Sequence, residues 1–237
     1  MRKIILLLLF VFISGFSKSQ YHELGMFIGA SNYVGDIGSD YYIMPETAAI
    51  GLIYKWNVTT RYSLRFSAMT SKLEGTDYRT DDLNRFGRAY SFSNNLKEGS
   101  IGIEFNFLDF NLHDQETINF SPYLYLGLSI IEYDEFYFNS TQIPVAKQIN
   151  FNKTQGLSIP INFGVKINPS PYWVLGAEIG ARYALNDNLD GSSPKGQGDN
   201  QGVEYFSFGS NNNDWYIFTG ITISFTFGDL PCYCKEE

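Results

Sequence analysis

The sequence predicts an all-β fold, an eight-stranded antiparallel transmembrane β-barrel with a filled polar interior. Three observations lead to this prediction. The segment 214–228, DWYIFTGITISFTFG, alternates large apolar residues with small or polar ones, and side chains on a strand point alternately to the two faces of a sheet. Seven further segments repeat the alternation, and a secretion signal precedes them. A soluble β-sandwich or lipocalin-like barrel would carry its polar face outward, so this pattern favours a barrel whose apolar face meets lipid.

The chain begins with the features of a secretory signal peptide over 1–19. A positively charged start and a short apolar run over 4–13 precede small residues, so we expect the mature chain to begin at Gln20. No later apolar run reaches about 18 residues, which excludes transmembrane helices. The expected organisation is a barrel over 20–228 followed by a periplasmic C-terminal tail over 229–237.

The charge balance bears on the class of partner. The formal net charge is −8, and losing three basic residues and no acidic ones with the signal takes it to −11. Nucleic acids select for basic surfaces, so a nucleic-acid partner is not expected. The 17 Tyr, 20 Phe and 22 Gly residues suit strands and interfacial girdles more than a helical enzyme.

Eight segments are long enough to cross a membrane as tilted strands. They are 21–30, 48–57, 62–72, 97–107, 120–133, 157–168, 172–185 and 214–228. The outward sets of the first seven segments, in chain order, include Leu24, Met26 and Ile28; Ile50, Leu52 and Tyr54; Tyr62, Leu64, Phe66 and Ala68; Ile101, Ile103 and Phe105; Leu124, Leu126 and Leu128; Leu157, Ile159 and Ile161; and Trp173, Leu175 and Ala177. None of these residues is charged, as a lipid-facing surface requires. Glu132 shares the outward parity and is expected to lie beyond the apolar band.

The opposite parity brings charged residues together in the interior. They are Glu23, Lys55, Arg65, Glu104, Lys166, Glu178 and Arg182. An eight-stranded barrel is just wide enough to be filled by side chains, and buried charges need partners. The sequence therefore predicts an ion-paired, closed lumen and not a pore, in which Glu178 and Arg182 pair mainly across strands.

The connections between the segments alternate in length. They are 31–47, 57–61, 75–96, 108–119, 135–156, 168–171 and 186–213. Outer-membrane barrels have short periplasmic turns and longer extracellular loops, so both chain ends are expected in the periplasm. Aromatic residues then form a girdle at the periplasmic rim. They are Tyr21, Trp56, Tyr62, Phe107, Phe120, Tyr172, Trp173, Phe225 and Phe227.

The residues that enzymes and metal sites use are sparse. His22 and His113 are the two histidines, and the turn around His113 has acidic neighbours but no serine nucleophile. The 186–191 stretch NDNLDG resembles a calcium loop, yet Gln197 stands where a bidentate Glu belongs. We therefore expect no catalytic residue, metal or cofactor, and regard 186–191 as the hydrated start of a loop.

The tail beyond Phe227 has a distinct composition. Its residues Leu230, Pro231, Cys232, Tyr233 and Cys234 are candidates for contact with a periplasmic partner. Cys232 and Cys234 are the only cysteines, and the periplasm is oxidising. A strained local disulfide, a free thiol pair and an intermolecular disulfide through either cysteine all remain open, and a partner contact is the interpretation we favour.

The order of several stretches resembles PorG-like outer-membrane proteins of the type IX secretion system of Bacteroidota. The stretches are ELGMFIGASNYVGDIG (23–38), IYKWNVTTRYSLR (53–65), YSFSNNLKEGSIGIEFNFLDF (90–110), SPYLYLGLSI (121–130), LGAEIGARYALNDNLDG (175–191), NDWYIFTGITISFTFG (213–228) and PCYC (231–234). The middle of the third and fourth outer loops matches least.

The resemblance implies a non-enzymatic barrel of the outer membrane. Its implied partners are the periplasmic ring proteins of the PorK and PorN type, called GldK and GldN in gliding species, of which one is a lipoprotein held under the outer membrane. The contact surface would be the turns 57–61 and 108–119 with the tail 229–237. Three other functions remain open, namely an outer-surface adhesin or binding barrel that uses its long loops, a lipid-modifying enzyme, and a narrow channel.

Overall fold

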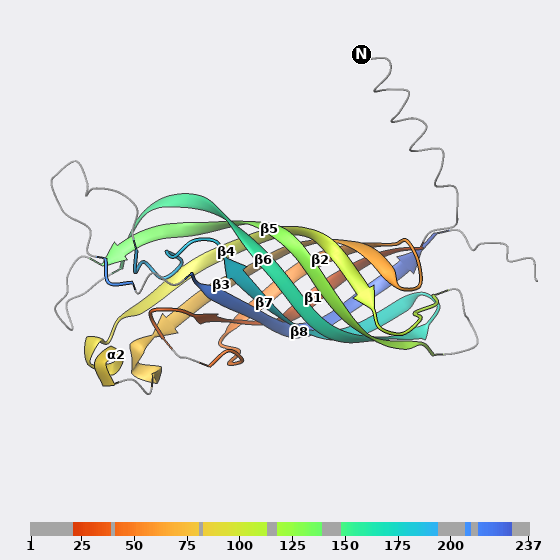
Figure 1. The fold of residues 1–237 in the computed structure, drawn as a ribbon, viewed down its shortest axis with the longest axis horizontal. Coiled ribbons are helices and arrows are strands. Elements are labelled where there is room, and N and C mark those ends of the chain that lie inside the picture. Colours follow the sequence, from red (N-terminus) through yellow and green to blue (C-terminus); the bar gives the residue numbers. More distant parts are fainter. Residues whose placement is uncertain are drawn as a thin grey trace, which may run out of the picture.

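Eight antiparallel strands form a closed barrel in the computed structural model (Figure 1), which describes residues 21–38, 41–80, 83–112, 118–138, 148–193, 207–209 and 213–228. The strands are β1 (Tyr21–Val34), β2 (Thr47–Asn57), β3 (Tyr62–Thr76), β4 (Ser91–Asn106), β5 (Phe120–Phe138), β6 (Gln148–Ser170), β7 (Trp173–Ala184) and β8 (Trp215–Phe227). Each strand pairs with the next, and β8 pairs with β1. A 3-10 turn, η1 (Asp77–Arg79), and a short helix, α2 (Leu83–Arg88), lie between β3 and β4. The predicted fold class is confirmed.

The register explains how alternation becomes an outer wall. Where β1 pairs with β8, Leu24 lies opposite Phe225 and Met26 opposite Ile223, and all four side chains are exposed. Between them, the buried Ser224 lies opposite Gly25. Paired residues point to the same face of a sheet, so apolar residues on neighbouring strands merge into one continuous surface.

An uncharged apolar belt therefore surrounds the barrel. On β5, the side chains of Leu126, Leu128 and Ile130 are 56%, 65% and 59% exposed. An ion pair between Lys97 and Glu132, 3.1 Å long, stands at the upper edge of this belt, as predicted for Glu132. Soluble proteins rarely expose so large a contiguous apolar surface to water, so this belt indicates contact with a membrane. No helix among the described residues has the length and apolarity needed to cross a membrane.

The two ends of the barrel differ in their connections. At the end that we call the turn end, 58–61, 107–119 and 171–172 join the strands, and β1 starts and β8 stops there (Figure 1). The connections from β1 to β2, β3 to β4, β5 to β6 and β7 to β8 leave from the opposite end, which we call the loop end. Of these connections the structure describes 35–38, 41–46, 77–80, 83–90, 185–193, 207–209 and 213–214. Successive connections alternate between the two ends, but the predicted alternation of short and long lengths is incomplete, because 107–119 at the turn end is longer than 139–147 between β5 and β6.

The strands extend further toward the loop end than predicted. β4 begins at Ser91, β5 continues to Phe138 and β6 begins at Gln148, so the loops expected at 75–96 and 135–156 are in part paired strand. Side chains here have the reverse polarity of those in the belt. Phe92, Tyr133 and Phe136 are buried inside the wall, whereas outward Lys97 pairs with Glu132.

The extension thus has an apolar interior and a polar exterior, the arrangement of a soluble barrel. In the sequence, polar residues at outward positions interrupt the alternation expected of membrane-spanning strands. The same strands nevertheless continue to pair beyond the belt, toward the loop end. Continued pairing satisfies the backbone, and the apolar interior removes aromatic side chains from water.

Candidate functional site

A two-point ion pair between β3 and β7 lies at the centre of the lumen charges. The Arg65 guanidinium donates from Nη1 to Oε2 of Glu178 at 2.7 Å and from Nη2 to Oε1 at 2.8 Å. The Tyr123 hydroxyl donates to the same carboxylate at 2.7 Å. All three side chains are buried. Removing charges from water is costly, and this fork geometry with an added hydrogen bond offsets the cost.

A second carboxylate connects the remaining bases to this pair. Lys55 and Lys166 each donate to Oε1 of Glu104, at 2.9 and 2.7 Å, and Arg65 lies 3.4 Å from Oε2. Five of the seven predicted lumen residues therefore form one connected network. Inward glycines and serines among these charges leave the space that the long side chains fill.

Arg182, the sixth predicted residue, has a partner that the sequence reasoning missed. Its Nε atom lies 3.5 Å from Oε2 of Glu98, and the Tyr216 hydroxyl donates to that oxygen at 2.6 Å. Arg182 also donates to the Gly180 carbonyl and covers the Phe218 ring at 4.5 Å. Glu98 lies on β4 six residues before Glu104, within the predicted segment 97–107. Residues an even number of positions apart on a strand share a face, so the same alternation assigns Glu98 to the interior.

With Glu98 the inward charges of the belt region balance. Glu23, Glu98, Glu104 and Glu178 are acidic, and Lys55, Arg65, Lys166 and Arg182 are basic. The predicted set carried one surplus positive charge, and Glu98 neutralises it.

Glu23, the seventh predicted residue, has a different role from the one expected. It is buried at the turn end and accepts a hydrogen bond from Asn57 at 2.8 Å, and its second oxygen has no hydrogen-bond partner among the described residues. Its nearest strand neighbour, Lys55, is directed to Glu104 instead.

The connection over 107–119 contributes side chains that close the turn end. Phe110 and Leu112 are buried with Val174 in a small apolar cluster. The Lys166 ammonium lies 4.6 Å from the centre of the Phe110 ring, and the Phe110 amide donates to the Thr60 carbonyl at 3.2 Å. Part of a connection that we expected at the surface thus lies beneath the ion network.

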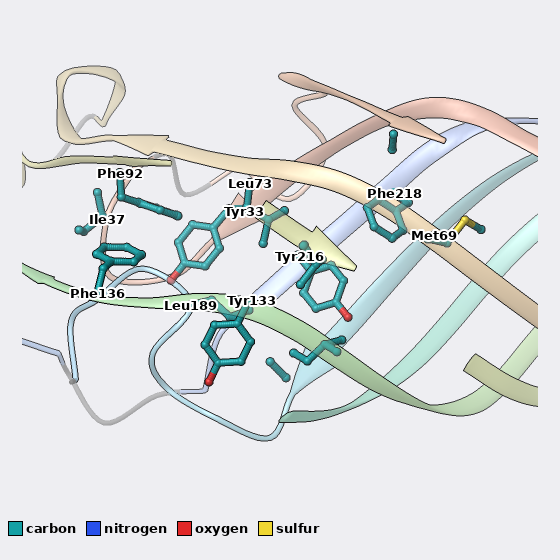
Figure 2. Close-up of a cluster of buried hydrophobic side chains, with 14 of the residues drawn as sticks. Tyr33, Ile37, Met69, Leu73, Phe92, Tyr133, Phe136, Leu189, Tyr216 and Phe218 are labelled. Carbon is teal, nitrogen blue, oxygen red and sulfur yellow. The ribbon is translucent and has the colours of Figure 1, made fainter. Parts of the chain in front are cut away.

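An apolar core closes the lumen toward the loop end (Figure 2). Its residues are Phe27, Tyr33, Ile37, Ala49, Ile53, Met69, Leu73, Tyr90, Phe92, Leu96, Ile131, Tyr133, Phe136, Phe138, Ala184, Leu189, Tyr216 and Phe218. Tyr33 and Phe92 meet edge to face with ring centroids 4.9 Å apart. These side chains occupy the interior between the ion network and the loop end. Together with the ion network, they fill the barrel along its length.

Three buried aspartates fasten the loops onto this core. Asp77 accepts hydrogen bonds from the Gly38 and Tyr90 amides and an ion pair from Arg88 at 2.8 Å. Asp190 accepts from the Ile37 and Ser192 amides, and Asp214 accepts from the Leu189 amide and the Tyr33 hydroxyl. Each carboxylate thus joins segments that are distant in the sequence, which satisfies backbone donors that would otherwise be buried without partners.

The loop-end carboxyl groups crowd one another. Burial, together with the nearby Asp36 and Asp190, raises the pKa of Asp187 to about 6. Burial also raises the pKa of Asp190 and of Asp214. Close carboxylates in a poorly hydrated site cannot all ionise freely, so this region favours a higher proton occupancy than an unfolded chain.

The structure places the sparse catalytic and metal candidates as follows. His22 stacks between Tyr54 and Phe227 in the turn-end girdle, where its Nδ1 lies 2.8 Å from the Tyr54 hydroxyl. His113 and Gln197 lie outside the described residues. In the calcium-like stretch 186–191, both Asp190 oxygens accept backbone hydrogen bonds, and the described residues contain no group of three or more His, Cys, Asp or Glu that could hold a metal.

The predicted signal peptide 1–19 and the predicted tail 229–237, with Leu230, Pro231, Cys232, Tyr233 and Cys234, also lie outside the described residues. The last described residue, Gly228, follows β8 at the turn end, where Phe227 pairs with His22.

Two shallow hollows lie on the outer surface of the belt. Their volumes are about 730 and 690 Å³, and both are floored by Ala68 and Gly99 between the larger side chains of Leu52 and Ile130. Their lining is mostly apolar, with the charged residues Lys97, Glu98 and Glu132 bordering the second hollow, so hydrocarbon chains of the surrounding lipid suit their apolar parts.

A closed eight-stranded barrel with an uncharged belt and an ion-paired lumen is the architecture of small outer-membrane β-barrel proteins, and the fold places this chain in that class. More particularly, the chain belongs to the family described as a domain of unknown function (DUF6089), whose model matches residues 2–236.

Several solved barrels are similar in shape. Ail, the attachment invasion locus protein of Yersinia pestis, is 10% identical with a TM-score of 0.42, over 89% of this chain and 100% of that one. Neisserial surface protein A is 10% identical with a TM-score of 0.46, over 88% and 97%. OprG from Pseudomonas aeruginosa is 8% identical with a TM-score of 0.43, over 89% and 97%. The search of curated proteins finds no match. The membrane assignment rests on the exposed belt.

Proposed function

We propose that this barrel is a non-enzymatic outer-membrane component of the type IX secretion machinery, which contacts a periplasmic ring of the PorK/PorN (GldK/GldN) type through its turn end. The observation that carries the proposal is the position of the first and last strand ends. β1 begins and β8 ends at the same end of the barrel as the connections 58–61 and 107–119, so the chain beyond Gly228 continues from the surface that would meet a partner. The ordered PorG-like stretches, which include PCYC, name the partner class.

The filled lumen supports a contact role over transport. The ion network, the Phe110 cluster and the apolar core occupy the interior from one end to the other. A barrel of this kind acts through its surfaces. In the proposal the loop end faces the cell exterior and the turn end faces the periplasm, as the short-turn arrangement of outer-membrane barrels requires.

The turn end has the features of a preformed contact surface. Arg61 forms an ion pair with Asp109 and donates to the Phe107 carbonyl at 2.7 Å, which joins the two connections. The hydrogen bond from Arg61 lowers the pKa of the Asp109 carboxyl, so the pair stays charged. Beside it, Val58, Leu108 and Ile118 are 45%, 49% and 70% exposed. The turn end thus offers a partner both exposed apolar side chains and a fixed charged pair.

The test is a mild-detergent pull-down of the full chain from membranes of its native cells, with mass spectrometry, with and without reductant. We expect lipoprotein and ring proteins of the PorK and PorN type to be recovered. Replacing 229–237 by a Gly/Ser stretch of equal length should reduce their recovery at least tenfold. A Cys232→Ser, Cys234→Ser variant should lose any disulfide-linked complex, that is, any complex that dissociates only when reductant is added.

The matched control is a Gly/Ser replacement within 139–147, the connection between β5 and β6, which should leave recovery unchanged. Ring proteins recovered equally from the tail replacement would remove the tail contact. Their absence from the wild-type pull-down would overturn the proposed function.

The alternative, an outer-surface adhesin or binding barrel, predicts the reverse dependence. Tyr41, Ile43, Tyr78, Leu83 and Phe86 are exposed at the loop end, and such side chains suit a protein contact. Under this alternative, alanine substitution of these exposed residues would abolish surface binding, and the tail replacement would not.

A further inference from the structure

A pocket of about 360 Å³ lies on the outer wall at the loop end, apart from the lumen and from the belt hollows. Three aromatic and three polar side chains supply most of its lining: Tyr42, Tyr183, Trp215, Asp36, Arg85 and Asn213. The volume lies near the lower end of the range of about 300–1,000 Å³ that small-molecule sites occupy. Its mixed lining distinguishes it from the lipid-facing hollows.

The strands build the back of this pocket. Val34, Trp215 and Tyr183 are register partners across β1, β8 and β7 and therefore share the outward face. The Tyr183 and Trp215 rings lie with centroids 4.9 Å apart, inclined at 51°. Asn213 donates to the Tyr183 hydroxyl at 2.8 Å, which fixes the position of that ring. Rigid strands thus hold two large aromatic surfaces in place before any ligand arrives.

The connection 35–46 forms a second side of the pocket because it folds back on the wall. Asn32 and Ile217 pair on the outward face, yet each is only 2% exposed. The Asn32 amide donates to the carbonyls of Tyr41 and Tyr42, at 3.4 and 3.0 Å, and the Glu46 amide donates to the Ser31 carbonyl at 3.0 Å. These bonds fasten Tyr42 beside the pocket.

The third side comes from α2, which presents Arg85. The ion pair between Arg88, at the end of this helix, and the buried Asp77 holds α2 against the barrel. Asp36 follows β1 and is 7% exposed. Arg85, Asp36 and Asn213 all line the pocket beside the aromatic rings, so its lining includes residues with hydrogen-bond donors and residues with acceptors.

This combination matches one ligand chemistry. A pyranose ring has a face of C–H groups, which packs on the electron-rich face of an aromatic ring, and an edge of hydroxyls, which both donate and accept hydrogen bonds. We propose that the pocket binds one or two sugar units of a cell-surface glycan. The sugar would stack against Trp215 and Tyr183, and Arg85, Asp36 and Asn213 would bind its hydroxyls.

Two sources can supply such a sugar at this position, which lies just beyond the belt. One is the saccharide of the lipopolysaccharide that surrounds the barrel, and the other is a polysaccharide or glycoconjugate that is not anchored beside it. The chemistry of recognition is the same for both, so the ligands in the experiment must distinguish them.

Trp215 provides a direct readout. In the mature barrel in detergent, Trp56→Phe and Trp173→Phe leave Trp215 as the sole tryptophan. We expect its emission to change saturably on titration with at least one of lactose, cellobiose, maltose and chitobiose. Displacement of that disaccharide by lipopolysaccharide assigns the neighbouring-lipid source, and displacement only by lipid-free surface polysaccharide assigns the other. Both results support the pocket.

Arg85→Ala and Tyr183→Ala should each weaken the response at least tenfold. Arg79→Ala and Tyr78→Ala, which alter exposed residues outside the pocket lining, are the matched controls and should bind normally. Heat-modifiable migration on a gel verifies folding, and Arg85→Ala alone decides if Tyr183→Ala does not fold. A barrel that responds to no disaccharide or glycan, or whose response survives both pocket substitutions, overturns the proposal.

Discussion

Arg65 on β3 and Glu178 on β7 meet across the lumen in a two-point ion pair, with N–O distances of 2.7 and 2.8 Å and both side chains fully buried. The strands that carry them are not neighbours in the barrel. The contact therefore braces opposite walls, which strand pairing alone does not do.

Breaking this pair should be costly. Glu178→Ala leaves a buried guanidinium without its main counter-ion, so we expect a loss of about 3–5 kcal/mol in the free energy of unfolding. Arg79→Ala removes a surface pair with Glu46 and should cost about 0–1 kcal/mol. Urea unfolding in lipid vesicles measures both. Similar losses in the two variants would show that the lumen network does not stabilise the barrel.

The Glu98–Arg182 contact should behave as a coupled unit. Glu98→Gln leaves Arg182 without its counter-ion and should cost several times more than Arg182→Met with Glu98→Gln combined, since replacing both partners removes the uncompensated charge. A double-mutant cycle in the same unfolding assay measures the coupling. Additive losses would mean that the balance of lumen charges has no energetic consequence here.

The filled interior predicts an electrically silent barrel. Purified protein in planar bilayers should give no steady current, because ion pairs and packed aromatic side chains occupy the lumen. A general porin reconstituted in the same way provides the positive control. Stable, reproducible conductance steps from the folded barrel would contradict the closed lumen.

The belt should tolerate charge according to depth. Leu126→Arg places a cation on the lipid face in the middle of β5 and should cost about 2–4 kcal/mol. Ile118→Arg, beyond the girdle at the turn end, should cost about 0–1 kcal/mol. Unfolding in vesicles compares the two. If the substitutions were equally tolerated, the surface around Leu126 would not face hydrocarbon.

The loop end should be more stable in mild acid. The pKa of Asp187 rises from its usual 3.8 to about 6 in the folded state, so the folded form binds a proton more tightly than the unfolded form. The penalty for ionisation is complete above about pH 6 and is relieved as the pH falls toward 4. The raised pKa values of Asp190 and Asp214 act in the same direction.

Limited proteolysis or amide hydrogen exchange at the loop end should therefore show more protection at pH 5 than at pH 7.5. Asp187→Asn should reduce that difference by gaining protection at pH 7.5, while Asp134→Asn, on the outer surface, is the control. Protection that increases with pH would contradict the assigned burial of these carboxyl groups.

Much of the barrel was predictable from local pattern. Alternation is a property of neighbouring residues, so the outward Leu126 and the inward Arg65 follow from counting along one strand. The same counting predicted Glu104 and Lys166 as inward charges, and Glu98 was accessible to it. Counting along a strand cannot predict that Glu23 bonds to Asn57 while Lys55 and Lys166 bond to Glu104. That outcome depends on distances between side chains on different strands.

The strand ends toward the loop end illustrate a different limit. Phe92 and Phe136 fall within the stretches 75–96 and 135–156 that the sequence predicts as loops, yet both are buried in paired strands. Their burial depends on contacts with the distant Ile37 and Leu189 in the same core. The local sequences of β4 and β5 carry no signal that would predict those contacts.

The amino-acid order by itself determined which face of each strand meets lipid, because the period of a strand assigns every side chain to one of two faces. Only the closed tertiary structure decided which buried charges pair, how far the strands extend beyond the belt, and that Tyr42, Arg85 and Trp215 border one pocket. Those outcomes depend on distances between segments remote in the chain, which are defined only once all eight strands are in register.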